Sequence, residues 1–179
     1  MASVRTAPYG SWKSPISGEV LASGSSLPSE LTLDGETPYW LELKPSEGGR
    51  YALYRKRRGR PPEEVVPKEF NVRTRVHEYG GGSYAARGPT VYFVNFGDQR
   101  LYRLDEGGSP KALTKEGLRY ADFVVDERRE RLVAVCEDHT GKGRYPVNSI
   151  ASFSMDGTSS RTLVSGNDFY SSPSLDGEG

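Results

Sequence analysis

Cysteine is nearly absent from this chain of 179 residues, which contains one cysteine, Cys136, and two histidines. A single cysteine cannot form an internal disulfide, and so few sulfur and imidazole groups offer no cluster for zinc. Cys136 ends the apolar run 132–136, which indicates a small buried side chain rather than a reactive thiol. We therefore expect no metal, no cofactor and a reducing, cytoplasmic compartment.

Net charge and long apolar runs are absent as well. Lysine plus arginine number 24, as do aspartate plus glutamate, so the chain lacks the basic excess of a nucleic-acid-binding protein. The N-terminus lacks the apolar core of a secretory signal, and no window approaches the roughly 18 apolar residues of a membrane helix. We expect neither nucleic acid nor a membrane as a partner.

One local concentration of positive charge lies between residues 50 and 60. Its members are Arg50, Arg55, Lys56, Arg57, Arg58 and Arg60. This run is compatible with an acidic partner. However, Glu63 and Glu64 follow it and offset its charge, which is more typical of a solvated hairpin tip.

Tyrosine, glycine and proline are abundant, with 11, 21 and 12 residues, while apolar residues make up only 35% of the chain. This composition favours many short strands joined by exposed turns. Strands are predicted at residues 30–33, 36–43, 50–54, 90–94, 101–104, 110–113, 120–125, 131–136, 149–154 and 161–164, and residues 168–174 resemble the opening of a further set.

Two segments are ambiguous. Residues 14–22 are compatible with a strand or with a short helix. Within residues 116–135, the apolar positions are also spaced as on a helix, but the adjacent β-branched residues Val124 and Val125 favour a strand, and we predict a strand there.

The strand sets repeat along the chain. Similar apolar triplets begin at Tyr39, Tyr92 and Leu132, about 40 to 53 residues apart. Repeats of this length with four short strands each are typical of a β-propeller. We therefore predict an all-β fold that forms part of a propeller, with about three four-stranded antiparallel blades and the start of another. The single propeller region spans residues 1–179, with approximate blades at 14–66, 83–113 and 119–165 and the next beginning at 168–179.

Residues 71–82 (NVRTRVHEYGGG) form the most unusual segment, because ionisable side chains crowd against three consecutive glycines. Glycine permits a sharp backbone turn, which would hold the charged side chains near one another. Such a turn is typical of a polar wall that receives a charged ligand, or of a plain connection between two strands. The substrate-facing candidates in this segment are Arg73, Arg75, His77, Glu78 and Tyr79.

These residues resemble a known family. The chain is similar to the N-terminal propeller of the prolyl oligopeptidase family of serine peptidases, in the branch of acylaminoacyl-peptidases and dipeptidyl aminopeptidases. The resemblance covers residues 7–177, and its most specific part is the 71–82 segment. It also rests on residues 7–16 (APYGSWKSPI), 39–42, 95–96, 98–102, 119–122, 137–139 and 168–173.

The resemblance implies that the propeller caps an α/β-hydrolase domain and restricts entry to short peptides. The hydrolase domain would carry the Ser-Asp-His triad and would be the main partner, but it is absent from the 179 residues. No serine here has glycines at positions −2 and +2, as a nucleophile elbow requires. The nearest match is Ser83, where Ala85 replaces the second glycine. His139 lies in a polar stretch and is interpreted as a solvated loop residue.

Two functions from different classes follow. The first is a non-catalytic propeller that gates or positions short peptides for a serine peptidase, with no catalytic residue of its own. The second is a stand-alone binding or scaffold propeller. In either case, open blade edges predict self-association.

Overall fold

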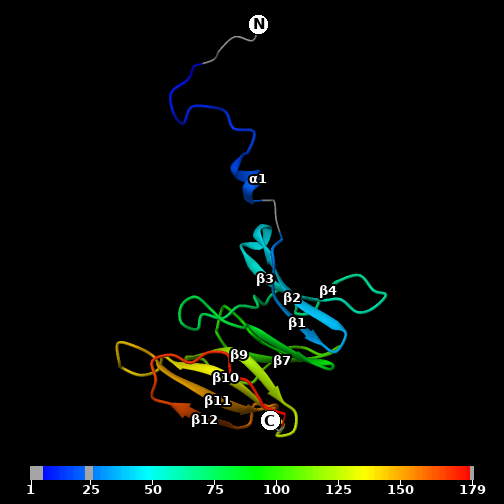
Figure 1. Cartoon of the computed structure of the whole chain (residues 1–179), viewed down its shortest axis with the longest axis vertical. Coiled ribbons are helices and arrows are strands. Elements are labelled where there is room, and N and C mark those ends of the chain that lie inside the picture. The colour runs from blue at the N-terminus through cyan, green and yellow to red at the C-terminus, as the bar shows by residue number, and fades with distance from the viewer. Residues whose placement is uncertain (1–5, 23–25, 178–179) are drawn as a thin grey trace.

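The computed structural model describes residues 6–22 and 26–177. The described strands form three four-stranded antiparallel sheets (Figure 1). The first sheet contains β1 (Pro28–Asp34), β2 (Thr37–Lys44), β3 (Arg50–Arg55) and β4 (Glu63–Glu64). The second contains β5 (Tyr84–Arg87), β6 (Thr90–Val94), β7 (Leu101–Asp105) and β8 (Lys111–Ala112). The third contains β9 (Leu118–Asp126), β10 (Arg131–Asp138), β11 (Val147–Ser154) and β12 (Ser160–Ser165).

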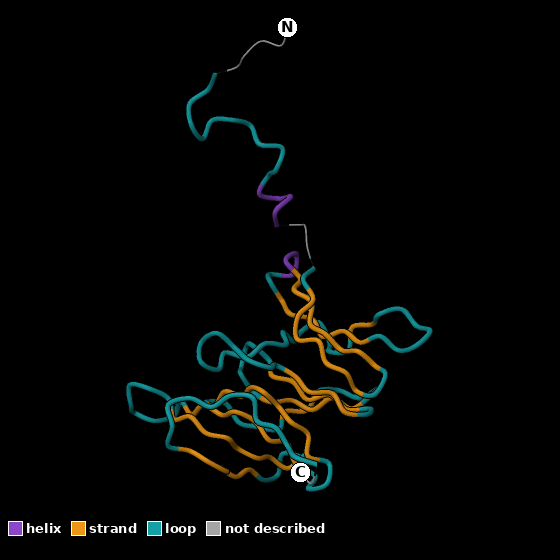
Figure 2. The backbone as a smooth tube through the Cα atoms, viewed as in Figure 1, coloured by secondary structure: helices purple, strands orange, loops and turns teal. Residues whose placement is uncertain are grey.

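Each sheet is a meander, because its strands are hydrogen-bonded in the order in which they follow one another along the chain. The sheets are grouped one after another, with loops between them (Figure 2). The structure thus confirms the predicted all-β fold of a partial, unclosed β-propeller.

The core lies between the sheets. β6 is buried at every residue because the middle sheet has a neighbour on both faces. One face contributes Phe93 to a cluster with Leu41 of the first sheet. The other face contributes Tyr92 to a cluster with Tyr120 of the third sheet. Burial of each large apolar side chain stabilises the fold by about 1.5 to 3 kcal/mol, so these two interfaces hold the sheets together.

Most predicted strands occur close to the expected residues, and β6 coincides with the predicted 90–94. The ambiguous N-terminal segment contains the short helix α1 (Gly18–Ala22), which lies away from the sheets (Figure 1). The 3-10 helix η1 (Pro45–Glu47) occupies the turn between β2 and β3. Residues 168–174 run as a loop with no strand pairing among the described residues, since a strand forms only where a partner strand pairs with it.

We call β1 and β9, the first strands of the first and third sheets, the inner strands, and an acidic residue in each links neighbouring repeats. Glu30 of β1 and Asp122 of β9 have positive φ, and the strand register shifts beside each of them. The Glu30 carboxylate accepts hydrogen bonds from the Ser83 backbone amide at 2.7 Å and from its hydroxyl at 3.1 Å. The Asp122 carboxylate accepts from the amides of Gly82 at 2.6 Å and Ser172 at 2.9 Å. These bonds fix the end of the segment before β5 and the loop after β12 against the sheets.

Candidate functional site

The segment 65–83 connects β4 to β5 and contains all the substrate-facing candidates. Its middle part is extended and bonded to both flanking sheets, since the Val72 amide donates to the Tyr51 carbonyl at 2.9 Å and the Arg73 amide to the Val94 carbonyl at 3.2 Å. Inward and outward side chains therefore alternate. The buried ones are Val72, Thr74 and Val76, and the exposed ones are Arg73 and Arg75.

The chain reverses direction in a turn over residues 76–79. His77 and Glu78 have φ values of 55° and 66° there. Two adjacent non-glycine residues in the left-handed region are costly, at roughly 1 to 3 kcal/mol each, and persist only where the surroundings impose them. The Glu137 carboxylate accepts from the His77 amide at 2.9 Å, and the Arg119 guanidinium holds the Glu78 side chain. We call residues 76–79 the polar turn.

The glycines bring the polar turn against β9. Gly80 has a φ of +96°, which glycine adopts without strain. At Gly81, an added Cβ would lie 2.9 Å from the Cβ of Ala121 and 3.0 Å from a carboxylate oxygen of Asp122. The segment therefore turns sharply, as its glycines predict, and close packing against β9 requires glycine at position 81.

Charged groups meet at the exposed side of the polar turn. Arg119 of β9 donates through Nη1 to Glu78 Oε1 at 2.7 Å and to the Arg75 carbonyl at 2.8 Å. Arg75 Nη2 lies 3.8 Å from Glu78 Oε2, which is beyond hydrogen-bonding distance. The hydrogen bond and charge of Arg119 hold the pKa of the Glu78 carboxyl below its usual value. Glu78 is therefore an exposed, ionised carboxylate whose Oε1 is held by Arg119 and whose Oε2 lies beside Arg75.

Arg73 lies apart from this charged group. Its guanidinium lies 5.0 Å from the ring centre of Phe96 and 5.5 Å from that of Tyr51, in cation–π contact with both. The guanidinium of Arg75 lies 5.8 Å from the centre of the same Phe96 ring. The segment thus brings Arg75 and Glu78 together, while Arg73 packs on aromatic rings of the two flanking sheets.

Beneath the polar turn lies a buried carboxylate, Glu137 of β10. It accepts the His77 amide, and its Oε2 lies 3.0 Å from His139 Nε2 and 3.9 Å from Arg119 Nη1. The His77 ring is buried too, and its Nε2 lies 3.9 Å from Glu137 Oε1 with no hydrogen-bond partner in the described part of the chain. His139 is exposed, as expected of a loop residue, but it is bonded to the buried acid.

Sequence reasoning did not select Arg119, Glu137 or Phe169 as site residues. Each belonged to a short motif of the family resemblance, but only the fold shows that they surround the polar turn. Phe169 meets the His77 ring edge to face, with centroids 5.1 Å apart. These contacts join residues far apart in sequence, which spacing alone does not reveal.

The two residues that most resemble nucleophiles are both buried. Ser83 is 2% exposed and its hydroxyl donates to the Glu30 carboxylate, so it serves the link between repeats. Burial raises the pKa of the Cys136 thiol to about 11, which leaves it protonated at neutral pH. Among the described residues, no three histidine, cysteine or acidic side chains gather as a metal site would require, and no helix is long and apolar enough to cross a membrane.

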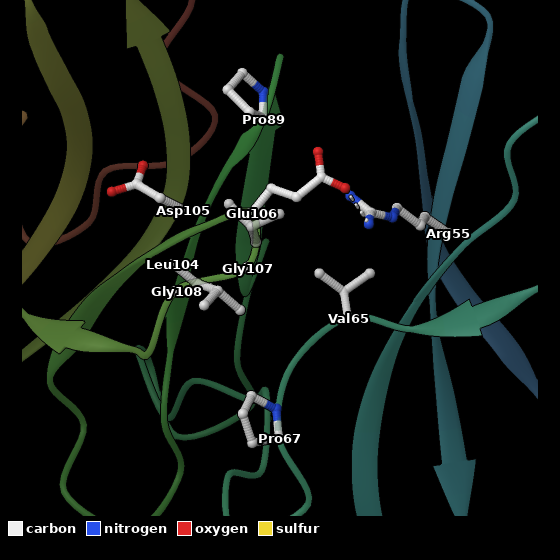
Figure 3. A pocket seen from close by; sticks show the side chains of 10 residues that line it. Arg55, Val65, Pro67, Pro89, Leu104, Asp105, Glu106, Gly107 and Gly108 are labelled. Atoms are coloured by element: carbon white, nitrogen blue, oxygen red, sulfur yellow. Dashed lines mark hydrogen bonds and ion pairs between the residues drawn. The ribbon is translucent and has the colours of Figure 1, made fainter.

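A separate cavity of about 240 Å³ lies between the first and second sheets. Figure 3 shows the Glu106 carboxylate facing the Arg55 guanidinium at the wall of this cavity. Arg55 Nη2 donates to Glu106 Oε1 at 3.0 Å. Val65, Pro67 and Leu104 supply apolar walls. No residue of the polar turn lines this cavity.

Comparison with solved structures finds two peptidases that are similar over almost the whole chain. A puromycin-hydrolyzing peptidase of Mycobacterium tuberculosis matches 94% of this chain with 39% identity and a TM-score of 0.82. A puromycin hydrolase matches 93% with 35% identity and a TM-score of 0.81. The chain spans 29% and 28% of the lengths of these two proteins. It therefore resembles the N-terminal part of a peptidase of the prolyl oligopeptidase family, as its motifs indicated.

A more distant match shows the fold alone. A putative TolB from Agrobacterium tumefaciens matches 80% of this chain, and 51% of its own length is covered, with 15% identity and a TM-score of 0.57. No protein-family model and no curated protein matches the chain.

Proposed function

We propose that this chain, which resembles the N-terminal part of peptidases of the prolyl oligopeptidase family, is a non-catalytic propeller region of a serine peptidase. It gates or positions short peptides for an α/β-hydrolase domain, in the manner of the acylaminoacyl-peptidase and dipeptidyl aminopeptidase branch. Support comes from the similarity to two peptidases over more than nine-tenths of the chain. The compartment we propose is the cytoplasm, because the chain's one cysteine is a buried thiol.

The observation that carries this proposal is the conformation of the polar turn. Two neighbouring residues, His77 and Glu78, are held in left-handed backbone conformations, and their side chains differ in burial. Backbone strain of this kind is concentrated at ligand-binding sites, where the surrounding structure maintains it. A plain strand connection needs neither the strain nor an exposed carboxylate braced by Arg119.

The candidate residues take different roles in the proposed site. Glu78 receives the ammonium group of a peptide substrate at Oε2, while Arg119 fixes the carboxylate through Oε1. Arg75 lies close enough to bind a substrate carbonyl or carboxylate beside it. Tyr79 faces the substrate from the exposed end of the turn, and His77 supports the turn from below. Arg73 lies beside the proposed site, where its cation–π contact with Phe96 holds its guanidinium in place.

The test is a Glu78→Gln substitution in the full-length peptidase whose propeller this chain forms. Loss of the charge-assisted hydrogen bond to the substrate ammonium should lower kcat/KM about 10- to 100-fold for substrates with a free amino terminus. Substrates with an acylated amino terminus should be unaffected. An equal loss for both substrate types would overturn the assignment of Glu78.

Glu127→Gln is the matched control. Glu127 is an exposed glutamate that accepts from Arg87 at 2.6 Å, as Glu78 accepts from Arg119 at 2.7 Å, but it lies in the turn between β9 and β10. The control should leave both substrate types unchanged. This comparison separates a substrate contact from the general loss of a surface ion pair.

The alternative function is a stand-alone binding or scaffold propeller, and self-association through an open edge is expected under either function. β12 is exposed along its whole length, including the apolar side chains Leu163 and Val164. An open strand edge with apolar side chains can pair with another edge, and the partner we propose is a second copy of this chain. Light scattering of the purified chain tests this: species above 19.7 kDa support pairing, and a monomer at all concentrations contradicts it.

A further inference from the structure

The carboxylate of Glu137 is almost completely buried, yet it faces the charged groups of the polar turn. Its side chain is 3% exposed, and Glu137 lies directly opposite Arg119 in the pairing of β10 with β9. Glu137 Oε2 lies 3.9 Å from Arg119 Nη1, which is too far for a hydrogen bond. Arg119 Nη1 donates instead to Glu78 Oε1 and to the Arg75 carbonyl. Glu137 therefore acts on Arg119 through its charge.

The formal charges around the polar turn show why this charge matters. Glu78 lies between two arginines, because Arg119 Nη1 is 2.7 Å from its Oε1 and Arg75 Nη2 is 3.8 Å from its Oε2. With the histidines neutral at pH 7, these three groups carry one surplus positive charge. A positive surplus repels an ammonium group. The carboxylate of Glu137 removes the surplus, so the four groups together are neutral.

Burial makes the charge of Glu137 effective. The Arg119 side chain is only 16% exposed, so protein rather than water lies between the two groups. Charges interact several-fold more strongly in such surroundings than in bulk water. Hydrogen bonds to both carboxylate oxygens hold Glu137 in place, from the His77 amide at 2.9 Å and with His139 Nε2 at 3.0 Å. Its charge is thereby fixed beneath the guanidinium.

We propose that Glu137 is a positioning residue, which offsets the charge of Arg119 and so allows Glu78 to bind a cation. Arg119 can then hold the Glu78 carboxylate without making the site repel the ligand. Glu137 acts only through Arg119 and does not touch the ligand. The inference rests on the proposed function, because it takes Glu78 as the ammonium-binding group. It adds the buried residue on which selection for positive charge depends.

Three small ligands that differ in charge test this inference on the 179-residue chain. L-phenylalaninamide is a cation, N-acetyl-L-phenylalaninamide is neutral, and N-acetyl-L-phenylalanine is an anion. Affinities are measured by ligand-observed NMR at about pH 7, where an α-amino group is mostly protonated. The unmodified chain should bind the cation more tightly than the other two ligands.

Glu137→Gln removes the charge and keeps the shape of the side chain. The glutamine carbonyl can still accept from the His77 amide, and its NH₂ group can donate to His139, so the variant should fold. The cation should bind about three- to tenfold more weakly, as expected of one charge lost near a partly exposed site. The anion should bind more tightly and the neutral ligand equally well. A residue that only supports the turn would weaken binding of all three ligands alike.

Glu137→Asp makes the opposite change, because it keeps the charge and shortens the side chain. It should retain the preference for the cation over the anion. The shorter side chain reaches the His77 amide less well, so the thermal midpoint should fall. Loss of the preference in this variant would overturn the inference, even if Glu137→Gln failed to fold.

Asp126→Asn is the matched control. Asp126 is also a buried carboxylate of the third sheet, 2.8 Å from Arg131 and 3.4 Å from Arg129. However, it is the last residue of β9, whereas Arg119 is the second. The control removes one buried negative charge and should leave the relative affinities for the three ligands unchanged. A thermal melt verifies that each variant is folded.

The outcomes distinguish this inference from the function on which it rests. Cation binding that is lost in Glu78→Gln but unaffected by Glu137→Gln would overturn the inference and leave the proposed function standing. An equal loss for all three ligands in Glu137→Gln would also overturn it. If the unmodified chain binds the neutral ligand as tightly as the cation, the role of Glu78 is wrong, and if no ligand binds, both proposals fall.

Discussion

Two connections between sheets in this molecule differ in length and in content. Residues 65–83 join the first sheet to the second, and residues 113–117 join the second to the third. The short connection only leads the chain from one sheet to the next. The Leu113 amide donates to the Leu101 carbonyl at 2.8 Å, and the chain then passes directly into β9. The long connection also contains the polar turn, for which the short connection has no counterpart.

The long connection is nevertheless as firmly fixed as a strand. Val72 and Val76 are almost completely buried, and its C-terminal end is bonded to the acidic residues of the inner strands through the amides of Gly82 and Ser83. Its exposed residues are Lys68, Glu69, the outward arginines, Glu78, Tyr79 and Gly81. A rigid support beneath a small exposed polar surface is the arrangement that positions a ligand-binding group accurately.

Removal of the Asp122 carboxylate should have the largest effect on the long connection. Asp122→Ala eliminates two charge-assisted hydrogen bonds, from Gly82 and Ser172, and leaves alanine at a positive φ. We expect the free energy of unfolding to fall by about 2 to 4 kcal/mol, measured by urea denaturation. Amide exchange should accelerate in residues 76–82 more than in 113–117.

Asp156→Ala provides the control. Asp156 also accepts several hydrogen bonds, including the Thr158 amide at 3.0 Å, but it lies in the exposed turn after β11. The control should cost clearly less than Asp122→Ala. Equal losses would mean that Asp122 has no special part in joining the repeats.

A methyl group at Gly81 should have an intermediate effect. Its Cβ would meet the Cβ of Ala121 at 2.9 Å, and neither atom can move without shifting backbone. Gly81→Ala should therefore reduce stability by about 1 to 3 kcal/mol, as overpacking does, and the thermal midpoint should fall accordingly. Gly141→Ala is the matched control, because its nearest neighbour lies 4.0 Å away. A neutral Gly81→Ala would show that the turn does not pack closely on β9.

The smallest effect concerns pH and Glu30, the second acidic residue that holds the C-terminal end of the connection. Burial raises the pKa of the Glu30 carboxyl, against the opposing effect of its hydrogen bonds from Ser83. Because the folded-state pKa is the higher one, the stability due to the protonated carboxyl is complete below about pH 4.5 and is lost as pH rises through the raised pKa. Glu30→Gln should remove this part of the pH dependence in denaturation curves. An unchanged pH profile would contradict the assignment.

The strands were predictable because alternating side chains and turn residues are local signals. Residues 90–94 form a strand that is buried on both faces, and the apolar run in the sequence predicts such a strand. The hydrogen bonds that Glu30 and Asp122 make between repeats were not predictable. Both residues adopt a positive φ, which is expected of glycine rather than of an acidic residue. The β-bulges beside them arise from pairing with the neighbouring strands, which is a tertiary effect.

The candidate site was predictable in part. Charged residues next to three glycines identified the segment that turns sharply, and the structure brings Arg75 and Glu78 together as the turn requires. The supporting residues Arg119 and Glu137 come from β9 and β10, some forty or more positions away in the chain. Their role depends on how the third sheet packs against the connection, and no local pattern encodes that.

The most direct test of a ligand site on the long connection is to map where a ligand binds. The ¹H–¹⁵N NMR spectrum of the labelled 179-residue chain should be recorded during a titration with L-phenylalaninamide. We expect chemical-shift changes confined to the amides of residues 75–82 and 167–172, with the amides of residues 113–117 unchanged. Shifts centred on the cavity beside Arg55 and Glu106, or spread evenly over the chain, would contradict it.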